Sequence, residues 1–474
     1  MKTLQTVEPT PEQMKLMVWP RPGIKIIRGA AGSGKTTTSI LMMKLSIGWL
    51  IDHFAENNHE GPINIRVFTF NKTLAAYIED LVQQEAIIPT EVQEKLDIQV
   101  MTLSKYMYRG LGYNPTIWNA NAQAQKIKVL GASIPLNGQF LADEVEYLLG
   151  RLDDDHLENY IDMERTGRGS IPRVDKNLRR QILDEVVYPY IESKKASNAL
   201  DWNDLALIFS KEKFDDIHIA IVDEAQDFSA NQLKAITQQL ADINFTTIVL
   251  DTNQKIYKRG FTWKEAGVDL KGALYARLEL NYRNTVEIAN FASKLIENSL
   301  ITIDDDGTLP RLDEIKRNGS KPIVVEGRFR KQMEFVFDYL QRNVDLTKES
   351  VGFLHAKGGG WFDEIRKTLS RKGFDFVEIS SESSWPPAET NIALSTIHSA
   401  KGLEFDYVFI VGLEDRHFSF SSDDNDDVDY STVIKLLSMG ITRAKQNVII
   451  SYNQSSKPSF LKHLDTSTYE LVTL

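Results

Sequence analysis

The stretch that decides the fold is Ile24-Lys-Ile-Ile-Arg-Gly-Ala-Ala-Gly-Ser-Gly-Lys-Thr-Thr37. Its opening residues include three isoleucines and predict a buried strand, and residues 35–53 continue with a helical pattern. The turn between them matches G-x-x-x-x-G-K-[ST], in which backbone N–H groups face phosphate oxygens. The N-terminus of the following helix adds positive potential at the same place. The stretch therefore predicts a phosphate-binding loop (P-loop) in an α/β protein.

The residue types of this loop suit a nucleoside triphosphate carried with Mg²⁺. Lys35 is expected to reach the β- and γ-phosphates, and the Thr36 hydroxyl is expected to bind Mg²⁺. The residues predicted to surround the phosphates are Gly29, Ala30, Ala31, Gly32, Ser33, Gly34, Lys35, Thr36 and Thr37.

Two adjacent carboxylates, Asp223 and Glu224, end the apolar run Ile217–Val222. Hydrolysis needs one carboxylate on Mg²⁺ and a second that orients or deprotonates the attacking water. An acidic pair at a strand end is common, so by itself it favours a catalytic site and an ordinary strand end about equally. Together with the P-loop it predicts ATP hydrolysis, with Asp223 as the second metal ligand.

Outside these motifs, short β-branched runs alternate with helical runs, which predicts parallel sheets covered on both faces. The predicted strands are Ile24–Arg28, Ile63–Thr69, Ile98–Met101, Ile217–Val222, Thr246–Leu250, Leu274–Leu280, Pro322–Val325, Ser350–Leu354, Asp375–Ile379, Asn391–Ser395, Asp406–Val411 and Asn447–Ser451. Between about Tyr106 and Phe214 the pattern is polar and helical, without clear strands. We therefore expect two α/β units, the first with a helical insertion.

Composition limits the class of protein. The chain has 474 residues, of which 42% are hydrophobic and 26% charged, values that exclude a mostly disordered chain. It has no cysteine, which excludes disulfides and thiolate sites and fits a reducing cytoplasm. No signal peptide or membrane-length apolar run is evident, so we expect a cytoplasmic protein with no membrane partner.

The chain is acidic, with 55 Lys and Arg against 66 Asp and Glu, a net charge of −11. A nucleic-acid partner would therefore need a local basic path. The segment Arg165–Arg180 contains six basic residues and one acidic residue, and it is a candidate for such a path. An ordinary solvated basic helix and loop is nearly as well supported.

Several further motifs follow in a fixed order: Gln13 before the P-loop, Asp223-Glu-Ala-Gln-Asp227, Asn281-Tyr-Arg-Asn-Thr285, Thr396-Ile-His-Ser-Ala-Lys-Gly-Leu-Glu404 and Gly440-Ile-Thr-Arg443-Ala. In this order they resemble the UvrD/Rep/PcrA-type superfamily 1A DNA helicases. The resemblance extends from Gln13 to Arg443, nearly the whole chain. The string T-x-H-x-x-K-G-L-E is its most specific part.

The resemblance implies two RecA-like parallel-sheet domains with ATP bound between them. It implies domain 1A at residues 1–105 and 215–277, the helical insertion 1B at 106–214, and domain 2A at 278–474. The large 2B insertion of the family is expected to be absent or reduced to the loop Ser380–Thr390, and no nuclease domain is expected.

For the ATP site, the resemblance assigns a role to each matching residue. Gln13 would read the adenine and Tyr282 would stack on it, while Glu404 would accept a hydrogen bond from the ribose. Gln254 would contact the γ-phosphate and the attacking water. Arg283 and Arg443 would act from the second domain as arginine fingers, because a guanidinium is permanently charged and can bind two phosphate oxygens.

For DNA, the resemblance points to contacts along the edges of both domains. The residues expected to touch DNA are Thr69, Phe70, Asn71, Lys72, Thr102, Tyr257, Thr396 and His398. Thr102-Leu-Ser104 departs from the usual T-x-H of the family, which weakens the assignment of Thr102.

Together these features predict an ATP- and Mg²⁺-dependent DNA helicase or translocase, moving 3′→5′ on single-stranded or tailed duplex DNA. A second hypothesis is an ATP-regulated DNA-sensing subunit that controls a nuclease or toxin partner, as in phage defence. The reduced 2B region favours it slightly, whereas the intact ATP motifs favour a motor. An RNA helicase is a third possibility, which the motifs only weakly disfavour.

Overall fold

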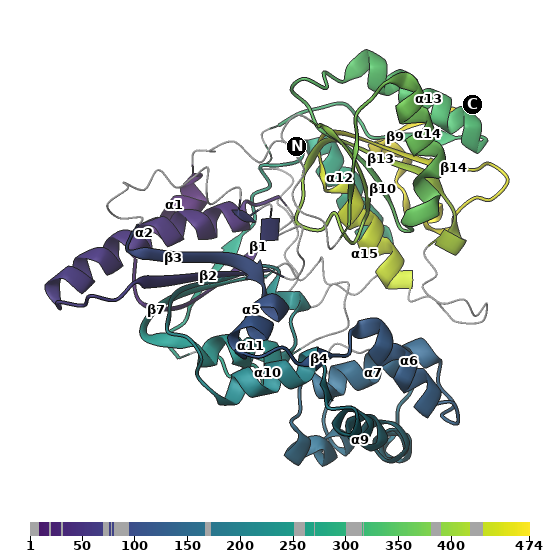
Figure 1. The fold of residues 1–474 in the computed structure, drawn as a ribbon. Coiled ribbons are helices and arrows are strands. Elements are labelled where there is room, and N and C mark those ends of the chain that lie inside the picture. Colours follow the sequence, from purple (N-terminus) through teal and green to yellow (C-terminus); the bar gives the residue numbers. More distant parts are fainter. Residues whose placement is uncertain are drawn as a thin grey trace.

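Two separate parallel β-sheets form the framework of the molecule (Figure 1). The computed structural model describes residues 9–18, 20–29, 32–69, 75, 76, 78, 79, 94–165, 172–250, 261–269, 271–299, 315, 317–380, 390–417 and 430–474. The first sheet has the strand order β3-β2-β6-β7-β1-β8, and the second has the order β11-β12-β10-β13-β14-β9-β15. All strand pairs in both sheets are parallel, which confirms the predicted fold class.

Every strand predicted from the sequence has a counterpart within a few residues. The first sheet contains β1 (Gly23–Gly29), β2 (Ile63–Thr69), β3 (Leu96–Thr102), β6 (Ile217–Val222), β7 (Leu240–Leu250) and β8 (Leu274–Leu278). The second contains β9 (Ile323–Glu326), β10 (Val351–His355), β11 (Val377–Ile379), β12 (Ile392–Thr396), β13 (Phe405–Leu413), β14 (Ala444–Tyr452) and β15 (Glu470–Thr473). Strand β15 was not predicted.

Helices cover both faces of each sheet. On the first sheet, α2 (Lys35–Glu56) packs on one face, and α5 (Leu103–Gly110), α10 (Trp202–Lys211) and α11 (Ala230–Gln238) pack on the other. On the second sheet, α12 (Val286–Asn298) and α15 (Tyr430–Ile441) lie opposite α13 (Phe329–Asn343) and α14 (Asp363–Lys372). The short helix α1 (Pro11–Met17) precedes β1.

A helical unit with its own apolar core is inserted between β3 and β6. Its helices are α6 (Ala120–Leu130), α7 (Gly138–Leu149), α8 (Lys176–Ile182) and α9 (Tyr188–Ala196), with a π-turn at Leu183–Val187. A short parallel pair, β4 (Thr116–Ile117) with β5 (Ala199–Leu200), closes its base. The buried core of this unit extends from Ile127 to Ile191.

The predicted limits of the insertion, 106–214, therefore include α10 and part of α5, which pack on the first sheet. Helices α5 and α10 contribute Met107, Leu205 and Phe209 to the core of the first sheet. The two-residue strands β4 and β5 also lie in a range that we expected to contain no strand. The assignment of the three parts as domains 1A, 1B and 2A stays a prediction.

The order of strands in the first sheet fixes where its site can form. Strand β6 is buried along its whole length, as expected for a β-branched strand covered on both faces. Only β7 separates β6 from β1 in the sheet. Because the strands are parallel, the segments that follow β1 and β6 leave the same edge of the sheet. The P-loop and the acidic pair Asp223-Glu224 are thus brought together.

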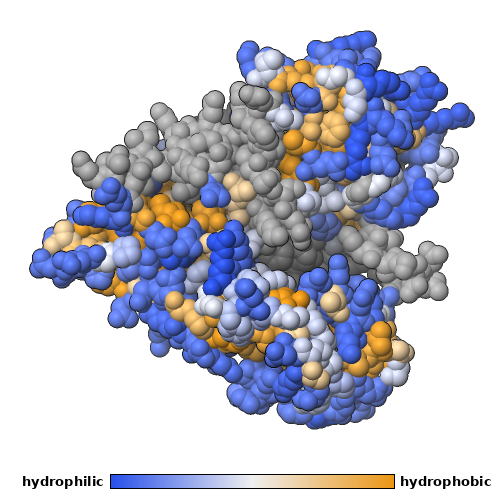
Figure 2. Space-filling model, in the orientation of Figure 1, coloured by the Kyte–Doolittle hydropathy of each residue, from blue (hydrophilic) through white to orange (hydrophobic). Residues whose placement is uncertain are grey.

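The visible surface is mostly hydrophilic. Figure 2 shows hydrophilic residues over most of the described surface on this side, with separate apolar patches. Among the described residues, no helix combines the length and apolar character needed to cross a membrane.

Candidate nucleotide and nucleic-acid site

The P-loop has the backbone geometry that its glycines permit. Gly34 precedes α2 with φ +73°, in the left-handed region that favours glycine. A Cβ there would lie 2.5 Å from Nε2 of Gln13, so a side chain would collide with a neighbouring predicted site residue. Gln13 is itself fixed, because it forms a capping box with Thr10 and donates from Nε2 to the Ser33 carbonyl at 3.2 Å. Gln13 therefore lies against the P-loop, where the adenine contact was expected.

Two P-loop side chains meet the groups expected of a Mg²⁺–phosphate site. The Thr36 hydroxyl donates to Oδ2 of Asp223 at 2.8 Å. The Lys35 ammonium donates to the Gly29 carbonyl at 2.9 Å, and this hydrogen bond crosses the P-loop. Hydroxyl and carboxylate oxygens are the hard ligands that Mg²⁺ prefers, so Thr36 and Asp223 fit the metal role.

The two carboxylates that follow β6 are in different electrostatic settings. Burial and the neighbouring charge of Glu224 raise the pKa of Asp223 to about 6. Burial acts in the same sense on Glu224, but the charges of Lys401, Lys35 and Arg443 outweigh it and lower the pKa of Glu224. Glu224 is therefore ionised at neutral pH, the state that a general base requires.

Glu224 has an unusual backbone conformation, and one oxygen of its carboxylate already has two contacts. Its φ of 54° lies in the left-handed region, which is uncommon for a residue with a side chain and is often found at functional sites. Gln226 donates from Nε2 to Oε2 of Glu224 at 2.5 Å. The ammonium of Lys401 lies 3.5 Å from the same oxygen.

The two predicted arginine fingers are held in the second half of the site. Arg283 donates from Nε to Glu404 at 2.6 Å, and Lys445 lies 3.5 Å from the other oxygen of that carboxylate. Arg443 is buried, and its Nε donates to the Met439 carbonyl at 3.2 Å. Glu404, expected to bind the ribose, thus pairs with Arg283.

Two asparagines join these arginine segments to each other and to the P-loop. Asn284 donates from Nδ2 to the Thr442 and Ala444 carbonyls, on either side of Arg443. Asn281 lies against Gly32, where an added Cβ would collide with its side chain. The Tyr282 N–H donates to the Gly32 carbonyl at 3.0 Å. The segment that carries Tyr282 and Arg283 is therefore in direct contact with the P-loop.

The predicted DNA contacts that the structure describes lie at the carboxyl ends of strands or just beyond. Thr69 ends β2 beside Thr102 at the end of β3. The Thr102 hydroxyl accepts from the Lys105 N–H and caps α5, a structural role. Thr396 ends β12 and closes a turn in which it accepts from the Ser399 N–H at 3.0 Å. Burial and the charge of Lys401 lower the pKa of His398 to about 4, so this side chain is neutral near pH 7.

Several predicted site residues lie outside the described part of the chain. They are Ala30, Ala31, Phe70, Asn71, Lys72, Gln254 and Tyr257. Their assignments stay predictions, as does that of Thr37, which lies in the first turn of α2.

Three of the six basic residues in the segment Arg165–Arg180 pair with carboxylates of the helical unit. Arg165 pairs with the buried Glu144 at 2.7 Å, and Arg180 pairs with Glu158 at 2.5 Å. Lys176 pairs with Asp162 at 2.5 Å, and Arg179 donates to the Tyr160, Ile161 and Met163 carbonyls. These contacts favour an internal structural role for the segment over an electrostatic track.

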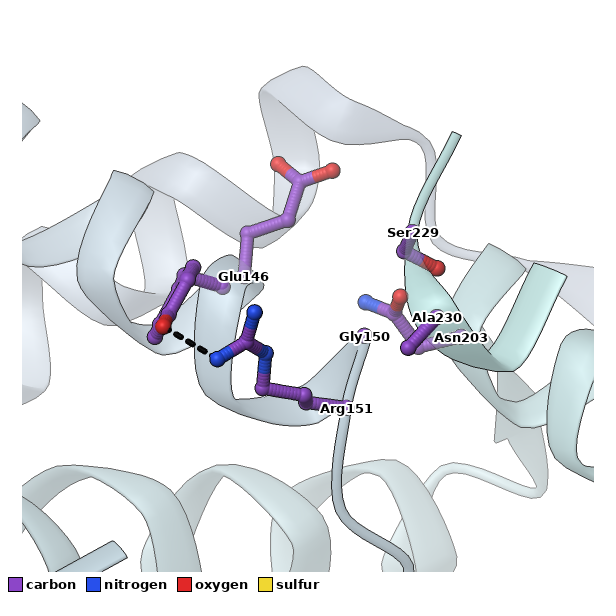
Figure 3. Close-up of a pocket in the computed structure, with 7 residues that line it drawn as sticks. Glu146, Gly150, Arg151, Asn203, Ser229 and Ala230 are labelled. Atoms are coloured by element: carbon purple, nitrogen blue, oxygen red, sulfur yellow. Dashed lines mark hydrogen bonds between the residues drawn. The ribbon is translucent and has the colours of Figure 1, made fainter. Parts of the chain in front are cut away.

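A small pocket lies apart from the predicted site, at the junction of the helical unit with α10 and α11 (Figure 3). Its lining residues are Glu146, Tyr147, Gly150, Arg151, Asn203, Ser229 and Ala230. Arg151 donates to the Tyr147 hydroxyl at 2.5 Å and lies 3.5 Å from Glu265. None of the residues predicted to bind ATP or DNA lines this pocket.

Three residues in the site received no role from the sequence, although they stand inside the quoted motifs. These residues are Lys401, Asp227 and Gln226. Lys401 forms ion pairs with Asp227 at 2.5 Å and with Glu224, and Gln226 donates a hydrogen bond to Glu224. Their positions within D-E-x-Q-D and T-x-H-x-x-K-G-L-E were the available signal. Which carboxylate the lysine meets depends on how the two sheets approach each other, and no single motif encodes that.

Two parts of the chain match known family models. Residues 10–270 match the model of the UvrD/REP helicase N-terminal domain, and residues 362–455 match the UvrD-like helicase C-terminal domain. A probable DNA helicase II homologue from Mycoplasma genitalium is 23% identical over 60% of this chain and 40% of its own length. A probable DNA helicase from Mycoplasma pneumoniae is 28% identical over 52% of this chain and 47% of its own.

A third relative matches a shorter part of the chain with a higher sequence identity. DNA helicase II from Haemophilus influenzae is 36% identical over 124 residues, which are 26% of this chain and 16% of that protein. The aligned parts thus cover less than half of the length of each of these three relatives.

Proposed function

Because the chain belongs to the UvrD/REP helicase family, we propose that it is a Mg²⁺-ATP-dependent DNA helicase or translocase acting on single-stranded or tailed duplex DNA. The observation that carries the proposal is the convergence of two half-sites. Thr36, Asp223 and Glu224 follow strands of the first sheet, and the segment of Arg283 contacts the P-loop at Gly32. Lys401 from the second sheet reaches Glu224 across the same junction.

The residues divide the chemistry of hydrolysis between them. Mg²⁺, held by Thr36 and Asp223, would neutralise charge on the phosphate oxygens. Lys35 would bind the β- and γ-phosphates, and Glu224 would take the proton from the attacking water. Arg283 and Arg443 would stabilise the charge that develops on the γ-phosphoryl group, where a permanently charged guanidinium is most effective.

ATP hydrolysis would be coupled to movement along DNA because both sheets contact the same nucleotide. If ATP draws the two sheets together and hydrolysis releases them, residues at the carboxyl edges, among them Thr396 and His398, alternate their grip on the strand. Translocation in the 3′→5′ direction is our expectation from the family resemblance.

The test is the ATPase rate of the purified chain with and without a single-stranded oligonucleotide. We expect the ATPase rate to rise when DNA is added. The variants Glu224→Gln and Lys35→Ala should each abolish ATP hydrolysis, with or without DNA. Near-normal turnover in both variants would overturn the site assignment. Strand separation on 3′-tailed and 5′-tailed duplexes then tests unwinding and its direction, and a matching RNA substrate tests the choice of nucleic acid.

One observation keeps a second function open. Strand β11 ends at Ile379 and its neighbour β12 begins at Ile392, so the connection that holds the large 2B insertion in relatives is short here. A DNA-sensing subunit that controls a nuclease or toxin partner would need the ATP site without processive unwinding. DNA-stimulated hydrolysis without strand separation on either tailed duplex would favour this second function.

A further inference from the structure

A buried group of three charges joins the two sheets at the nucleotide site. We call Lys401, Glu224 and Asp227 the Lys401 triad. The Lys401 ammonium lies 2.5 Å from Oδ2 of Asp227 and 3.5 Å from Oε2 of Glu224. All three side chains are buried: Lys401 is 3% exposed, Asp227 0% and Glu224 8%. The lysine follows a strand of the second sheet, whereas both carboxylates follow β6 of the first.

The triad places a positive charge on the carboxylate that hydrolysis is expected to use. Oε2 of Glu224 already accepts from Gln226, and the Lys401 ammonium lies against the same atom. A general base must present a free lone pair to water within hydrogen-bond reach. With Lys401 and Gln226 on Oε2, this oxygen is not available to a water molecule.

The backbone around Lys401 connects the triad to the predicted DNA contacts. Lys401 donates its N–H to the His398 carbonyl at 3.2 Å, and Ala400 donates to the Thr396 carbonyl at 2.9 Å. The Thr396 hydroxyl also accepts from the Ser399 N–H. Residues 396–401 therefore form one hydrogen-bonded turn with the predicted DNA contacts at its start and Lys401 at its end. A displacement of this turn moves the ammonium with it.

We propose that Lys401 is a positioning residue that withholds Oε2 of Glu224 from water until DNA binds to the 396–401 turn. This inference rests on the proposed function, since it concerns the control of the same ATPase site. DNA contact with Thr396 and His398 shifts the turn, and the ammonium leaves Glu224. Hydrolysis then proceeds on a carboxylate that can accept a proton.

The two contacts of the lysine differ in length, and the shorter one lowers the free-energy cost of moving the ammonium. Leaving a buried charge without a partner is strongly unfavourable. When the ammonium moves away from Glu224, however, the shorter contact to Asp227 keeps it paired. Asp227 thus retains the charge of Lys401 in both positions, and the buried Glu224 keeps the hydrogen bond from Gln226.

The test compares Lys401→Met, which removes the charge but keeps the chain length, with Lys401→Arg, which keeps the charge. For Lys401→Met we expect the DNA-free kcat to rise roughly threefold or more, because the base is no longer withheld. The ratio of DNA-stimulated to DNA-free turnover should fall, and KM for ATP should stay unchanged, because Lys401 contacts carboxylates. Lys401→Arg should retain most of the stimulation ratio, and Lys331→Met, at an exposed site on α13, is the matched control.

Folding is checked separately, because Lys401→Met leaves two buried carboxylates without their cation. The double variant Lys401→Met/Asp227→Asn removes one of these charges and should show the same rise in DNA-free kcat. Two outcomes in the folded variants would overturn the proposal. One is a DNA-free turnover and a stimulation ratio that both stay unchanged. The other is a fall of the DNA-free and the DNA-stimulated turnover by the same factor. Absence of any DNA stimulation in the unmodified chain would instead contradict the proposed function.

Discussion

At the scale of single residues, Arg283 is the side chain whose present contact differs most from its expected catalytic position. It donates to Glu404 at 2.6 Å, while its Cβ lies beside Gly32 of the P-loop. A rotation about its side-chain bonds would exchange the carboxylate for the γ-phosphate of a bound nucleotide. Glu404 would keep its contact with Lys445, and its other oxygen could then accept from the ribose, so the two predicted roles are compatible with the observed pair.

Arg283→Ala should therefore leave nucleotide binding nearly intact and reduce hydrolysis. We expect kcat to fall by about 100-fold or more, because an arginine finger acts mainly on transition-state charge. Titration with a fluorescent ATP analogue and steady-state ATPase assays measure the two quantities. Arg330→Ala is the matched control, since that side chain is 91% exposed and pairs only with Glu334 among the described residues. Equal losses in the two variants would contradict the assignment.

A second residue-scale prediction concerns pH and His355, at the end of β10. His355 is fully buried, stacks on Trp361 at 4.0 Å and accepts the Lys357 N–H on Nδ1 at 3.0 Å. Burial, with the charges of His417 and Lys357, lowers its pKa to about 3. In the unfolded chain the imidazole titrates near 6.5, so acid protonates the unfolded state first. Stability is therefore complete above pH 6.5 and is lost as the pH falls toward 3.

Urea unfolding at several pH values measures this effect. We expect the His355 contribution to cost about 1.4 kcal/mol of unfolding free energy between pH 7.5 and 5.5. In His355→Asn the amide oxygen can still accept from Lys357 but does not titrate. That variant should be less stable at pH 7.5 and less sensitive to acid. An identical pH slope in the two proteins would show that His355 is not the group responsible.

At the scale of elements, the junction between the helical unit and the first sheet rests on the first turn of α11. Asn231 is buried, donates from Nδ2 to the Leu149 carbonyl at 3.1 Å, and donates its N–H to the Gly150 carbonyl at 2.9 Å. The same turn follows directly from Asp227 and Phe228, after the acidic pair. Asn231 therefore joins the end of α7 to the segment that follows the acidic pair.

Asn231→Ala should loosen this junction without touching the nucleotide. We expect a loss of about 1–3 kcal/mol of unfolding free energy, because buried carbonyls at the end of α7 lose their donor. Hydrogen exchange at residues 147–152 should also become faster. Asn121→Ala, on an exposed position of α6, is the control. If both variants unfold at the same urea concentration and exchange alike, the junction does not depend on Asn231.

The elements also show what sequence patterns can and cannot predict. Strand β6 was predicted with its observed limits because Ile217–Val222 is short, β-branched and bounded by polar residues. Strand β15 was missed because Glu470–Thr473 is a short, mostly exposed edge strand that pairs only with β9 among the described strands. Helices α5 and α10 were assigned to the insertion because an amphipathic pattern does not reveal which core a helix joins.

At the scale of the whole molecule, the least predictable feature is the contact between the two sheets. The motifs predicted Lys35, Asp223, Glu224 and Arg283 as site residues, since each stands at a strand end or helix start with recognisable chemistry. The pairing of Lys401 with Asp227 joins segments 174 residues apart, one following each sheet. Such partners are set by how two folded units meet, and local patterns carry no information about that.

Because the predicted phosphate-binding residues come from both sides of this contact, we expect nucleotide binding to change the distance between the two sheets. The chain has no cysteine, so fluorescent labels can be attached at two introduced cysteines. Ala55→Cys on α2 and Ser370→Cys on α14 are exposed positions, one on each sheet's helical cover. A non-hydrolysable ATP analogue with Mg²⁺ should change the energy transfer between the labels, because bound phosphates attract Arg283 and Arg443 toward the P-loop. The same labels on the Lys35→Ala variant should respond only at much higher analogue concentration. Unchanged transfer in the labelled protein, under conditions where binding of the analogue is measured directly, would show that the two sheets form a rigid pair and that ATP acts without moving them.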